Sequence, residues 1–354
     1  MLHWPFGSNF DSTRRDFTQA VALGGLLAAS GTVFAQAGPV AAGTSDRMPV
    51  KIAWIPGSVY RLSLCVARDL FTKHGLNAEL IRFSSGPAMN AAFKSASVDM
   101  GFSGAPGVLT ILSTGAPLKV FMIDNNTATS NALVAVPGSG INTVADLKGK
   151  SIAIPRGTVV WVALIKALRQ NGLDLKDVNV VDMGAGPLIA AFRNKDVQAA
   201  WIWSPVLYEL LDMGGKEIVR DAKFGIAPNF WVGRSEWVEK NPQAVQRFLA
   251  AMDEAGAFHK ADPKESARLV AEQLGIKIAN AERLLQETTF FSMADQVAPV
   301  GPASLVNKST GALEALRSYA AILNEQGLLR AVPDLNSIID SSHVEAYLKT
   351  QHKG

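Results

Sequence analysis

The chain has 354 residues, of which 48% are hydrophobic and 18% are charged, and its formal net charge is +3. This composition is too apolar for a disordered protein, and the length predicts roughly two domains. The positive charges are spread along the chain, and no run of Lys and Arg interleaved with aromatic residues is present. Nucleic acid is therefore not expected as a partner.

Residues 1–37 have the pattern of an export signal. Arg14 and Arg15 lie in STRRDFTQ, which is followed by the apolar AVALGGLLAAS and by AQA, ending at Ala37. A basic segment, a short apolar segment and a small-x-small site in this order are typical of a twin-arginine signal. The alternative is an amphipathic helix with an incidental arginine pair. We expect a mature periplasmic protein, in which the single cysteine, Cys65, is a small buried hydrophobic residue.

From residue 48, short apolar segments alternate with segments of helical periodicity, in two series. The segments predicted as strands are 50–55, 76–84, 98–104 and 118–125, then 131–139, 150–155, 178–184, 198–203, 216–221 and 229–234. The segments predicted as helices between them are 63–75, 86–97 and 105–115, then 158–172, 186–196 and 204–215. This alternation predicts an α/β fold with parallel-rich sheets, and from residue 235 the chain is expected to be almost wholly helical.

The two series predict two lobes. Strand-like crossings near 125–131 and 225–231 would join them as a two-strand hinge. Lobe 1 is expected to comprise residues 48–127 and 229–354, including the helical tail, and lobe 2 residues 128–228.

Four strand-to-helix turns have compositions suited to a ligand, because ligands of open α/β sheets bind beyond the carboxyl ends of the strands. Small and hydroxyl residues precede or open the predicted helices at Ser103–Ala105, Gly186 and Ser204, the last as a helix N-cap before Pro205. At the fourth turn, Arg156 and Thr158 stand together. That turn either contacts an anion or is a plain cap with an exposed arginine.

Tryptophans are concentrated near these turns. Trp161 lies three residues after Thr158, Trp201 and Trp203 end a predicted strand, and Trp231 lies in the second crossing, where we expect it to face the gap between the lobes. For each of these tryptophans there are two possible roles, packing in the core or forming a wall of the ligand site.

Catalytic and cofactor motifs are weak. No histidine or cysteine accompanies a predicted strand-to-helix turn, and no HExxH, CxxC or clustered carboxylate indicates a metal. GAGPLIA (184–190) only faintly imitates a dinucleotide fingerprint. We expect no enzyme activity, no metal and no cofactor.

The order of GFSGAPGVLTIL, TVADLKGKSIAIPRGTV, MGAGPLIAAFRNKDVQAAWIWSPV and FWVGR resembles the periplasmic substrate-binding proteins of ABC importers for taurine, alkanesulfonates and nitrate. The resemblance implies a monomeric type II binding-protein fold that closes on a small organic anion and delivers it to an ABC permease. A sulfonate-like anion is the leading expectation, and an aromatic carboxylate, a nitrate-type anion or an exported enzyme of the same fold are the alternatives. The implied ligand-binding residues are Gly57, Ser58, Ser103, Gly104, Ala105, Arg156, Thr158, Trp161, Gly186, Trp203, Asn229 and Trp231.

One departure from the family concerns the ligand. Taurine binders carry an acidic residue just before the tryptophan-bearing strand, where this chain has Gln198. A buried ammonium group needs a compensating charge or an aromatic cage. We therefore expect an anion with an uncharged body, with Asp196 or Asp212 as the acids that could approach from a neighbouring turn.

Overall fold

The computed structural model describes residues 47–55, 59–83 and 86–351. The expected export signal at 1–37 lies outside these residues. Among the helices of the described part, none is both long and apolar enough to cross a membrane.

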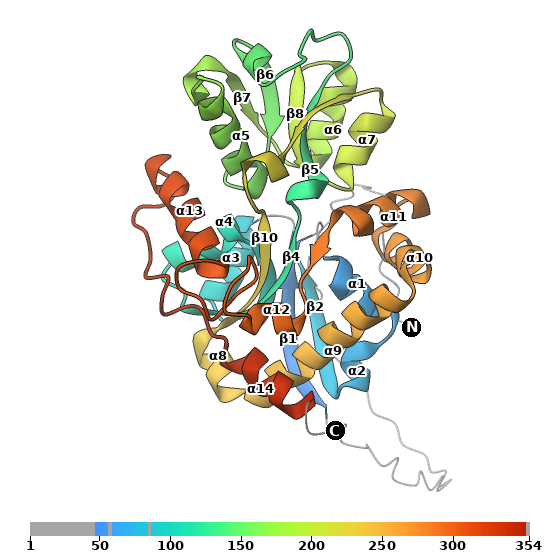
Figure 1. The fold of residues 1–354 in the computed structure, drawn as a ribbon, viewed down its shortest axis with the longest axis vertical. Helices are drawn as coiled ribbons and strands as arrows, with labels where there is room; N and C mark the ends of the chain where they lie inside the picture. Colours follow the sequence, from blue (N-terminus) through green and yellow to red (C-terminus); the bar gives the residue numbers. More distant parts are fainter. Residues whose placement is uncertain (1–46, 56–58, 84–85, 352–354) are drawn as a thin grey trace, which may run out of the picture. The chain divides into compact units, whose positions relative to one another are not determined.

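The larger sheet has six strands in the order β11-β4-β10-β3-β1-β2 (Figure 1). Its strands are β1 (Met48–Trp54), β2 (Leu76–Arg82), β3 (Met100–Gly104), β4 (Leu118–Asn126), β10 (Pro228–Arg234) and β11 (Thr289–Phe290). The strands β2, β1 and β3 are parallel. Strand β10 runs antiparallel between β3 and β4, and β11 is antiparallel to β4.

The smaller sheet has five strands in the order β7-β6-β8-β5-β9. Its strands are β5 (Asn131–Ala135), β6 (Ser151–Ile154), β7 (Asn179–Asp182), β8 (Ala199–Trp203) and β9 (Lys216–Arg220). Here β7, β6 and β8 are parallel, whereas β5 is antiparallel to β8 and β9. The α/β class is confirmed, but both sheets are mixed, because β5 and β10, the strands that follow the two crossings, run antiparallel to their neighbours.

Helices pack on both sheets. In the first part of the chain they are α1 (Tyr60–Ala67), α2 (Leu70–Lys73), α3 (Gly86–Lys94), α4 (Ala105–Ser113), α5 (Val159–Gln170), α6 (Ala185–Asn194) and α7 (Val206–Asp212). In the tail they are α8 (Ser235–Lys240), α9 (Pro242–Ala261), α10 (Pro263–Leu274), α11 (Ile278–Glu287), α12 (Met293–Val297), α13 (Ala312–Glu325) and α14 (Ser342–Gln351). Helices α5, α6 and α7 contact the smaller sheet, and α4, α8 and α14 the larger one.

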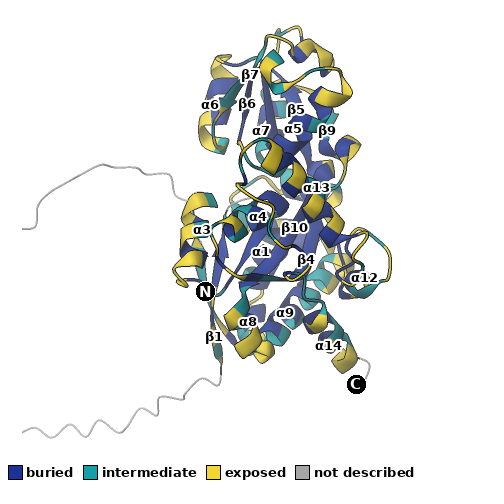
Figure 2. Ribbon diagram, turned by 90° about the vertical axis from the view of Figure 1, so that its left-hand side faces the viewer, coloured by how far each residue is buried: buried dark blue, intermediate teal, exposed yellow. Residues whose placement is uncertain are grey.

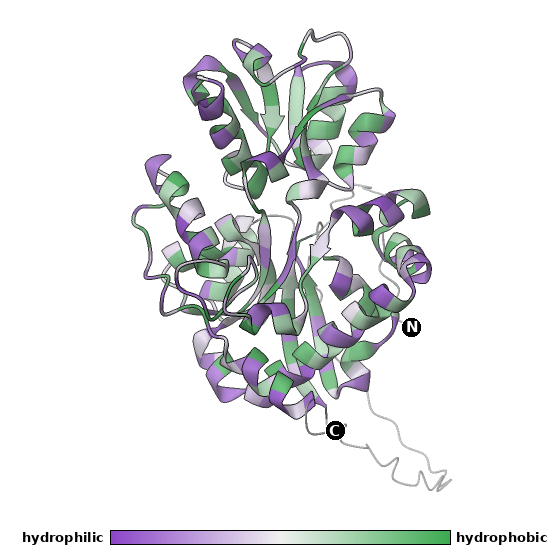
Figure 3. Ribbon diagram, viewed as in Figure 1, coloured by the Kyte–Doolittle hydropathy of each residue, from purple (hydrophilic) through white to green (hydrophobic). Residues whose placement is uncertain are grey.

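The core of the larger sheet is aromatic. The ring of Phe248, on α9, lies 4.7 Å from Trp231, 5.8 Å from Phe71 and 6.0 Å from Phe121, measured between centroids. The inner strands are buried and largely hydrophobic, whereas the edge strands β2, β7 and β9 and the outer face of α8 are more exposed (Figures 2 and 3). Burial of these apolar side chains, at about 25 cal/mol per Å², is the main force that holds the tail helices against the sheet.

Three local predictions are wrong. The segment 63–75 is interrupted after α1, where Asp69 has a φ of 52°. The tail contains β11 and long irregular stretches at 298–311 and 326–341, which are rich in the turn formers Pro, Gly, Ser and Asn. Ser204 is not an N-cap: α7 begins at Val206, and the Ser204 backbone N–H donates to Ser130 O at 2.9 Å.

Two crossings connect the sheets, as the sequence predicted, after β4 and before β10. They are hydrogen-bonded to each other: the Thr127 N–H donates to Ala227 O at 3.1 Å, and Asn131 Nδ2 donates to Asp221 Oδ2 at 2.9 Å. The Cα pairing of Asn126 with Pro228 continues this contact into the larger sheet. The crossings are therefore a paired connection.

Candidate ligand-binding site

A cavity of about 1060 Å³ lies between the two sheets, where several helices begin. Its lining includes the first residues of α3 and α4, which follow strands of the larger sheet, and of α5 and α6, which follow β6 and β7 of the smaller sheet. The volume is at the upper end of the range of roughly 300–1,000 Å³ that is usual for ligand pockets. The cavity is large enough for a drug-sized molecule.

Helix starts dominate the polar surface of this cavity. The N-cap residues of α4, α5 and α6 are Gly104, Thr158 and Gly184, and none of them makes a side-chain hydrogen bond to its helix. The free N–H groups of a first helical turn and the helix dipole favour an anion. Small residues at each turn leave the backbone uncovered where the strand ends and the helix begins, so a ligand can approach it closely.

The starts of α4 and α5 meet across the cavity. A Cβ atom placed on Gly104 would lie 3.4 Å from Cγ1 of Val159 and 3.2 Å from Oδ1 of Asn229. Glycine at this position therefore allows a close approach of elements that belong to different sheets.

Ser103 is the last residue before the α4 N-cap and is 6% exposed. Its hydroxyl lies over Gly107, where an added Cβ atom would be only 2.1 Å from Oγ. The hydroxyl makes one long contact, 3.4 Å to the Gly104 carbonyl oxygen. This weak bond leaves the hydroxyl available to donate to an anion at the start of α4.

Asn229 and Thr127 bring polar groups from the crossings to the cavity. Asn229 Nδ2 donates to Asn125 Oδ1 at 2.8 Å and to Thr127 Oγ1 at 3.3 Å. Both Asn229 and Thr127 are buried. A ligand that contacts Thr127 and Asn229 would therefore touch both of the connections between the sheets.

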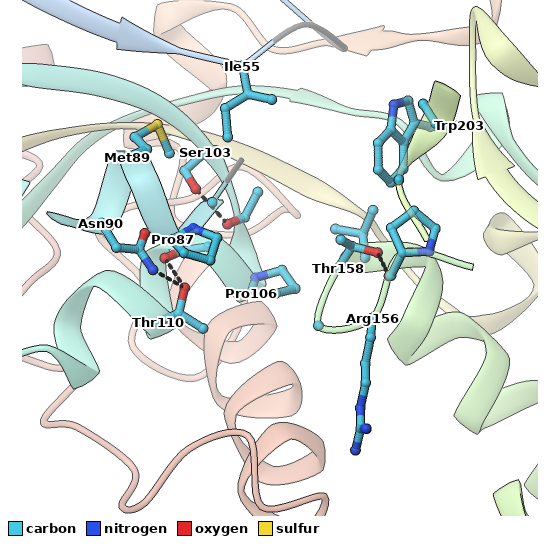
Figure 4. Close-up of a pocket in the computed structure, with 18 of the residues that line it drawn as sticks. Ile55, Pro87, Met89, Asn90, Ser103, Pro106, Thr110, Arg156, Thr158 and Trp203 are labelled. Atoms are coloured by element: carbon cyan, nitrogen blue, oxygen red, sulfur yellow. Dashed lines mark hydrogen bonds between the residues drawn. The ribbon is translucent and has the colours of Figure 1, made fainter. Parts of the chain in front are cut away.

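Thr158 and Arg156 lie on the opposite side from Ser103 and Thr110 (Figure 4). The Thr158 hydroxyl donates to Pro155 O at 2.7 Å, so it is engaged within its own turn. Arg156 is exposed, and its guanidinium extends away from Trp203 and lies 5.3 Å from the Trp161 ring centroid. Arg156 contributes positive charge at the edge of the cavity.

The four tryptophans expected near the site divide into one wall residue and three buried ones. Trp203, at the end of β8, lines the cavity and is partly exposed. Trp201, two residues earlier, is fully buried, and its Nε1 donates to Asp221 Oδ1 at 2.6 Å. Trp161, which is 2% exposed, is not among the lining residues.

Trp231 requires a correction. The expectation that it faces a gap is wrong, because its side chain is completely buried between Phe102, at 5.4 Å, and Phe248. It lies in the middle of β10, paired with Phe102 and Met122 of the neighbouring strands, where both of its faces are covered.

The other predicted residues fall into three groups. Gly104 and Gly186 line the cavity. Ala105 is fully buried and is not among the lining residues. Gly57 and Ser58 lie outside the described residues.

No acidic residue is present among the described residues that line the cavity, and the charged ones are Arg82 and Arg156. The sequence placed Gln198 where an acid would meet the ligand, and this placement is wrong. Gln198 does not line the cavity, and its Oε1 accepts a hydrogen bond from the Ser151 N–H at 2.8 Å within the sheet. Asp196 does not line the cavity either, and Asp212 is paired with Lys277. The described lining is therefore suited to an anion and offers no carboxylate to an ammonium group.

Sequence reasoning missed several lining residues. Thr127 follows a strand and carries a hydroxyl, which is the signal that could have revealed it. Asn90 on α3 donates to Thr110 Oγ1 on α4 at 3.2 Å, a contact between helices that no local pattern predicts. Leu323 and Leu328 come from the end of α13, far along the chain.

A buried carboxylate lies at the second crossing, outside the cavity lining. Asp221 is 3% exposed, and burial raises the pKa of this carboxyl to about 7, although hydrogen bonds from Asn131 and Trp201 and the charge of Lys166 oppose the shift. The hydrogen bonds from Asn131 on β5 and Trp201 on β8 therefore connect both strands to the second crossing.

The geometry defines an α/β binding-protein fold with a ligand cavity between two sheets. The model of the family described as NMT1/THI5 like matches residues 62–266, and the chain belongs to this family. A predicted binding protein of Brucella abortus is 32% identical over 67% of this chain and 75% of its own length. The taurine-binding periplasmic protein of Escherichia coli is 28% identical over 79% of this chain and 88% of that protein.

Solved structures share the fold. The periplasmic aliphatic sulphonate binding protein SsuA of Escherichia coli superimposes with a TM-score of 0.71, at 24% identity, over 82% of this chain and 92% of that chain. The alkanesulfonate-binding protein SsuA of Xanthomonas axonopodis pv. citri, bound to MOPS, has a TM-score of 0.69 at 22% identity, over 84% and 98%. The enzyme DSZB in complex with biphenyl-2-sulfinic acid has a TM-score of 0.67 at 17% identity, over 86% and 99%. The type II periplasmic binding-protein fold expected from the sequence is confirmed.

Proposed function

We propose that this protein captures an organic sulfonate in the periplasm, after twin-arginine export, and delivers it to the permease of an ABC importer. The observation that carries this proposal is the convergence of the α4, α5 and α6 starts, without side-chain caps, on a cavity whose described lining has no acidic residue. Several N–H groups at different helix starts suit an anion with three oxygen acceptors. The names of the taurine- and sulfonate-binding relatives support the same class.

The size of the cavity bears on the competing anions. A nitrate-type ion would occupy only a small part of about 1060 Å³. An aromatic carboxylate would fill more of it, but offers two oxygen acceptors instead of three. An organic sulfonate combines a three-oxygen head with a body that covers apolar wall, and burial of that wall adds about 25 cal/mol per Å².

An enzyme on this fold is the second candidate class, and DSZB is such a neighbour. The described lining contains no Cys, His, Asp or Glu. The single cysteine, Cys65, is fully buried in α1, and burial raises the pKa of its thiol far above its ordinary value, which disfavours the reactive thiolate. These features support binding without catalysis.

Closure is part of the proposal. Residues 48–127 with 229–354 and residues 128–228 would move as two lobes about the paired crossings when the ligand binds. Small-angle scattering should then show a smaller radius of gyration with a saturating sulfonate than without it.

Calorimetry with matched anions tests the function. The mature protein should bind an aryl- or alkylsulfonate, and the carboxylate with the same body should bind at least about 10-fold more weakly, as should nitrate. Ser103→Ala should weaken sulfonate binding, whereas Ser113→Ala, at the other end of α4, serves as the matched control. Tighter binding of the carboxylate or of nitrate would contradict the proposal.

A further inference from the structure

We propose that Leu323 and Leu328, at the end of α13, form a hydrophobic wall that selects sulfonates with an aromatic or cyclic body over short ones. This inference rests on the proposed function and adds to it the size class of the ligand. The pair Leu323 and Leu328 is called the α13 wall below.

The α13 wall is built by the way in which α13 ends. Gly327 has a φ of +67°, the left-handed conformation that favours glycine. Its N–H donates to Asn324 O at 2.9 Å, and the Leu328 N–H donates to Leu323 O at 2.8 Å. These two bonds define a Schellman motif, in which the residue after the glycine contacts the helix one turn back. The motif therefore brings Leu328 against Leu323, and both line the cavity.

Other contacts hold this helix in place beside the cavity. Helix α13 packs against α4, and Lys166 Nζ, on α5, donates to Ser318 Oγ at 3.4 Å. Tyr319 Oη donates to Ile226 O at 2.9 Å, at the second crossing. Arg169 on α5 pairs with Glu325. Helix α13 thus contacts α4, α5 and the second crossing, so the wall lies beside two of the helices whose starts would bind the anionic head.

The distance to the helix starts sets the length of the ligand. A Cβ atom placed on Gly157 would lie 3.9 Å from Cδ1 of Leu328, so the wall begins directly beside the α5 turn. Leu323 is fully buried and Leu328 is half-buried, which leaves Leu328 with surface to offer a ligand. A two-carbon sulfonate bound by Ser103 would leave most of about 1060 Å³ unfilled, whereas a fused-ring body would cover the wall.

The wall also lies outside the segment that defines the family. The family match ends at residue 266, and α13 begins at Ala312. The anion-binding turns are inside the match. The α13 wall therefore adds a contact to the body of the ligand from a part of the chain outside the family match, beside Trp203 inside it.

The test compares two sulfonates in Leu328→Ala. We expect the affinity for 2-naphthalenesulfonate to fall about 10-fold, which corresponds to losing roughly 55 Å² of apolar contact at about 25 cal/mol per Å². Ethanesulfonate should change less than about 2-fold, because its two carbons can cover little of the wall. The matched control is Leu329→Ala, since Leu329 belongs to the same turn and is 2% exposed but does not line the cavity. Thermal melts show whether each variant is folded.

Each outcome is decisive. A selective loss for the naphthyl ligand in Leu328→Ala, absent in Leu329→Ala, supports the α13 wall. Equal losses for both ligands, or no loss for either, overturn the wall while sulfonate binding by the unmodified protein stands. If the unmodified protein binds neither sulfonate, the proposed function itself is overturned, and the inference with it. Leu328→Met, which keeps an apolar side chain of similar volume, should restore most of the naphthyl affinity.

Discussion

The two sheets place helix starts at the same cavity but treat their buried polar groups and tryptophans differently. In the larger sheet, the buried Asp124 faces Arg61 at 3.2 Å, and Trp231 is enclosed in the middle of a strand. In the smaller sheet, the buried Asp221 is held by neutral donors, and Trp203 stands at a strand end beside the cavity.

This difference indicates that the two sheets contribute differently to stability and to the site. The larger sheet, with the tail helices packed on it, buries its carboxylate Asp124 in an ion pair with Arg61. Beside the smaller sheet, the Asp221 carboxyl at the second crossing accepts hydrogen bonds from neutral donors, with the charge of Lys166 acting on it, and the strand ends supply Trp203 and the α5 and α6 turns to the cavity. The substitutions below test the contrast, from the largest expected effect to the smallest.

The tryptophans should respond in opposite ways. Trp231→Ala should lower the free energy of unfolding by about 3–5 kcal/mol, because it removes a fully buried indole. Trp203→Ala should cost much less stability but weaken binding of an arylsulfonate. Denaturant unfolding and calorimetry on both variants measure this, with Trp231→Phe as the milder control. Similar unfolding losses in both alanine variants would remove the contrast.

The buried Asp221 carboxyl predicts a pH dependence of stability. The folded-state pKa of Asp221, about 7, lies above its ordinary value of 3.8, so the folded protein holds this proton more tightly than the unfolded chain. The contribution of Asp221 to the free energy of unfolding should therefore fall as the pH rises from about 3.8 to about 7, by at most about 1.4 kcal/mol per pH unit.

Unfolding of Asp221→Asn at several pH values checks this contribution. The variant should lose that part of the slope, whereas the exposed Asp212→Asn should keep it. An unchanged slope in Asp221→Asn would show that the carboxyl titrates normally.

The head site should depend on one glycine. Gly107→Ala would place a Cβ atom 2.1 Å from Ser103 Oγ and force that hydroxyl to rotate away from the α4 start. We expect sulfonate affinity to drop by about 1.5–3 kcal/mol, the value of a hydrogen bond to a charged group. Gly86→Ala is the control, because it also lines the cavity but has open space for a Cβ atom. Equal affinities of the two variants would argue against Ser103 as a donor.

The smallest effect is expected at Arg156. Its side chain is exposed and points away from Trp203, so Arg156→Ala should cost less than about 1 kcal/mol of binding, and raising the salt concentration should reduce even that. Calorimetry at low and high salt measures both values. A large, salt-insensitive loss would mean that the guanidinium turns into the cavity when the ligand binds.

Local pattern predicted most of the fold and two of the turns that line the cavity. Strand-to-helix turns such as Ser103–Ala105 and the Arg156–Thr158 turn follow from composition and periodicity, and the structure brings them together. Local pattern failed where the position of a side chain depends on the packing of segments distant in the sequence. Alternation places Trp231 on a strand, but only the arrival of Phe248 from α9 determines that the ring is enclosed. Likewise, Leu328 is a routine helix-end residue until α13 packs beside α4 and α5.

The central claim is our proposal that the cavity binds a sulfonate and that its described lining offers no carboxylate to an ammonium group. Taurine and 1-propanesulfonate are matched for this question, since they differ mainly in an ammonium group in place of a methyl group. Isothermal titration calorimetry of the two ligands should give at least about 10-fold tighter binding of 1-propanesulfonate, because a buried unpaired charge is costly and no acidic residue is among the described lining residues. Tighter binding of taurine would contradict the account.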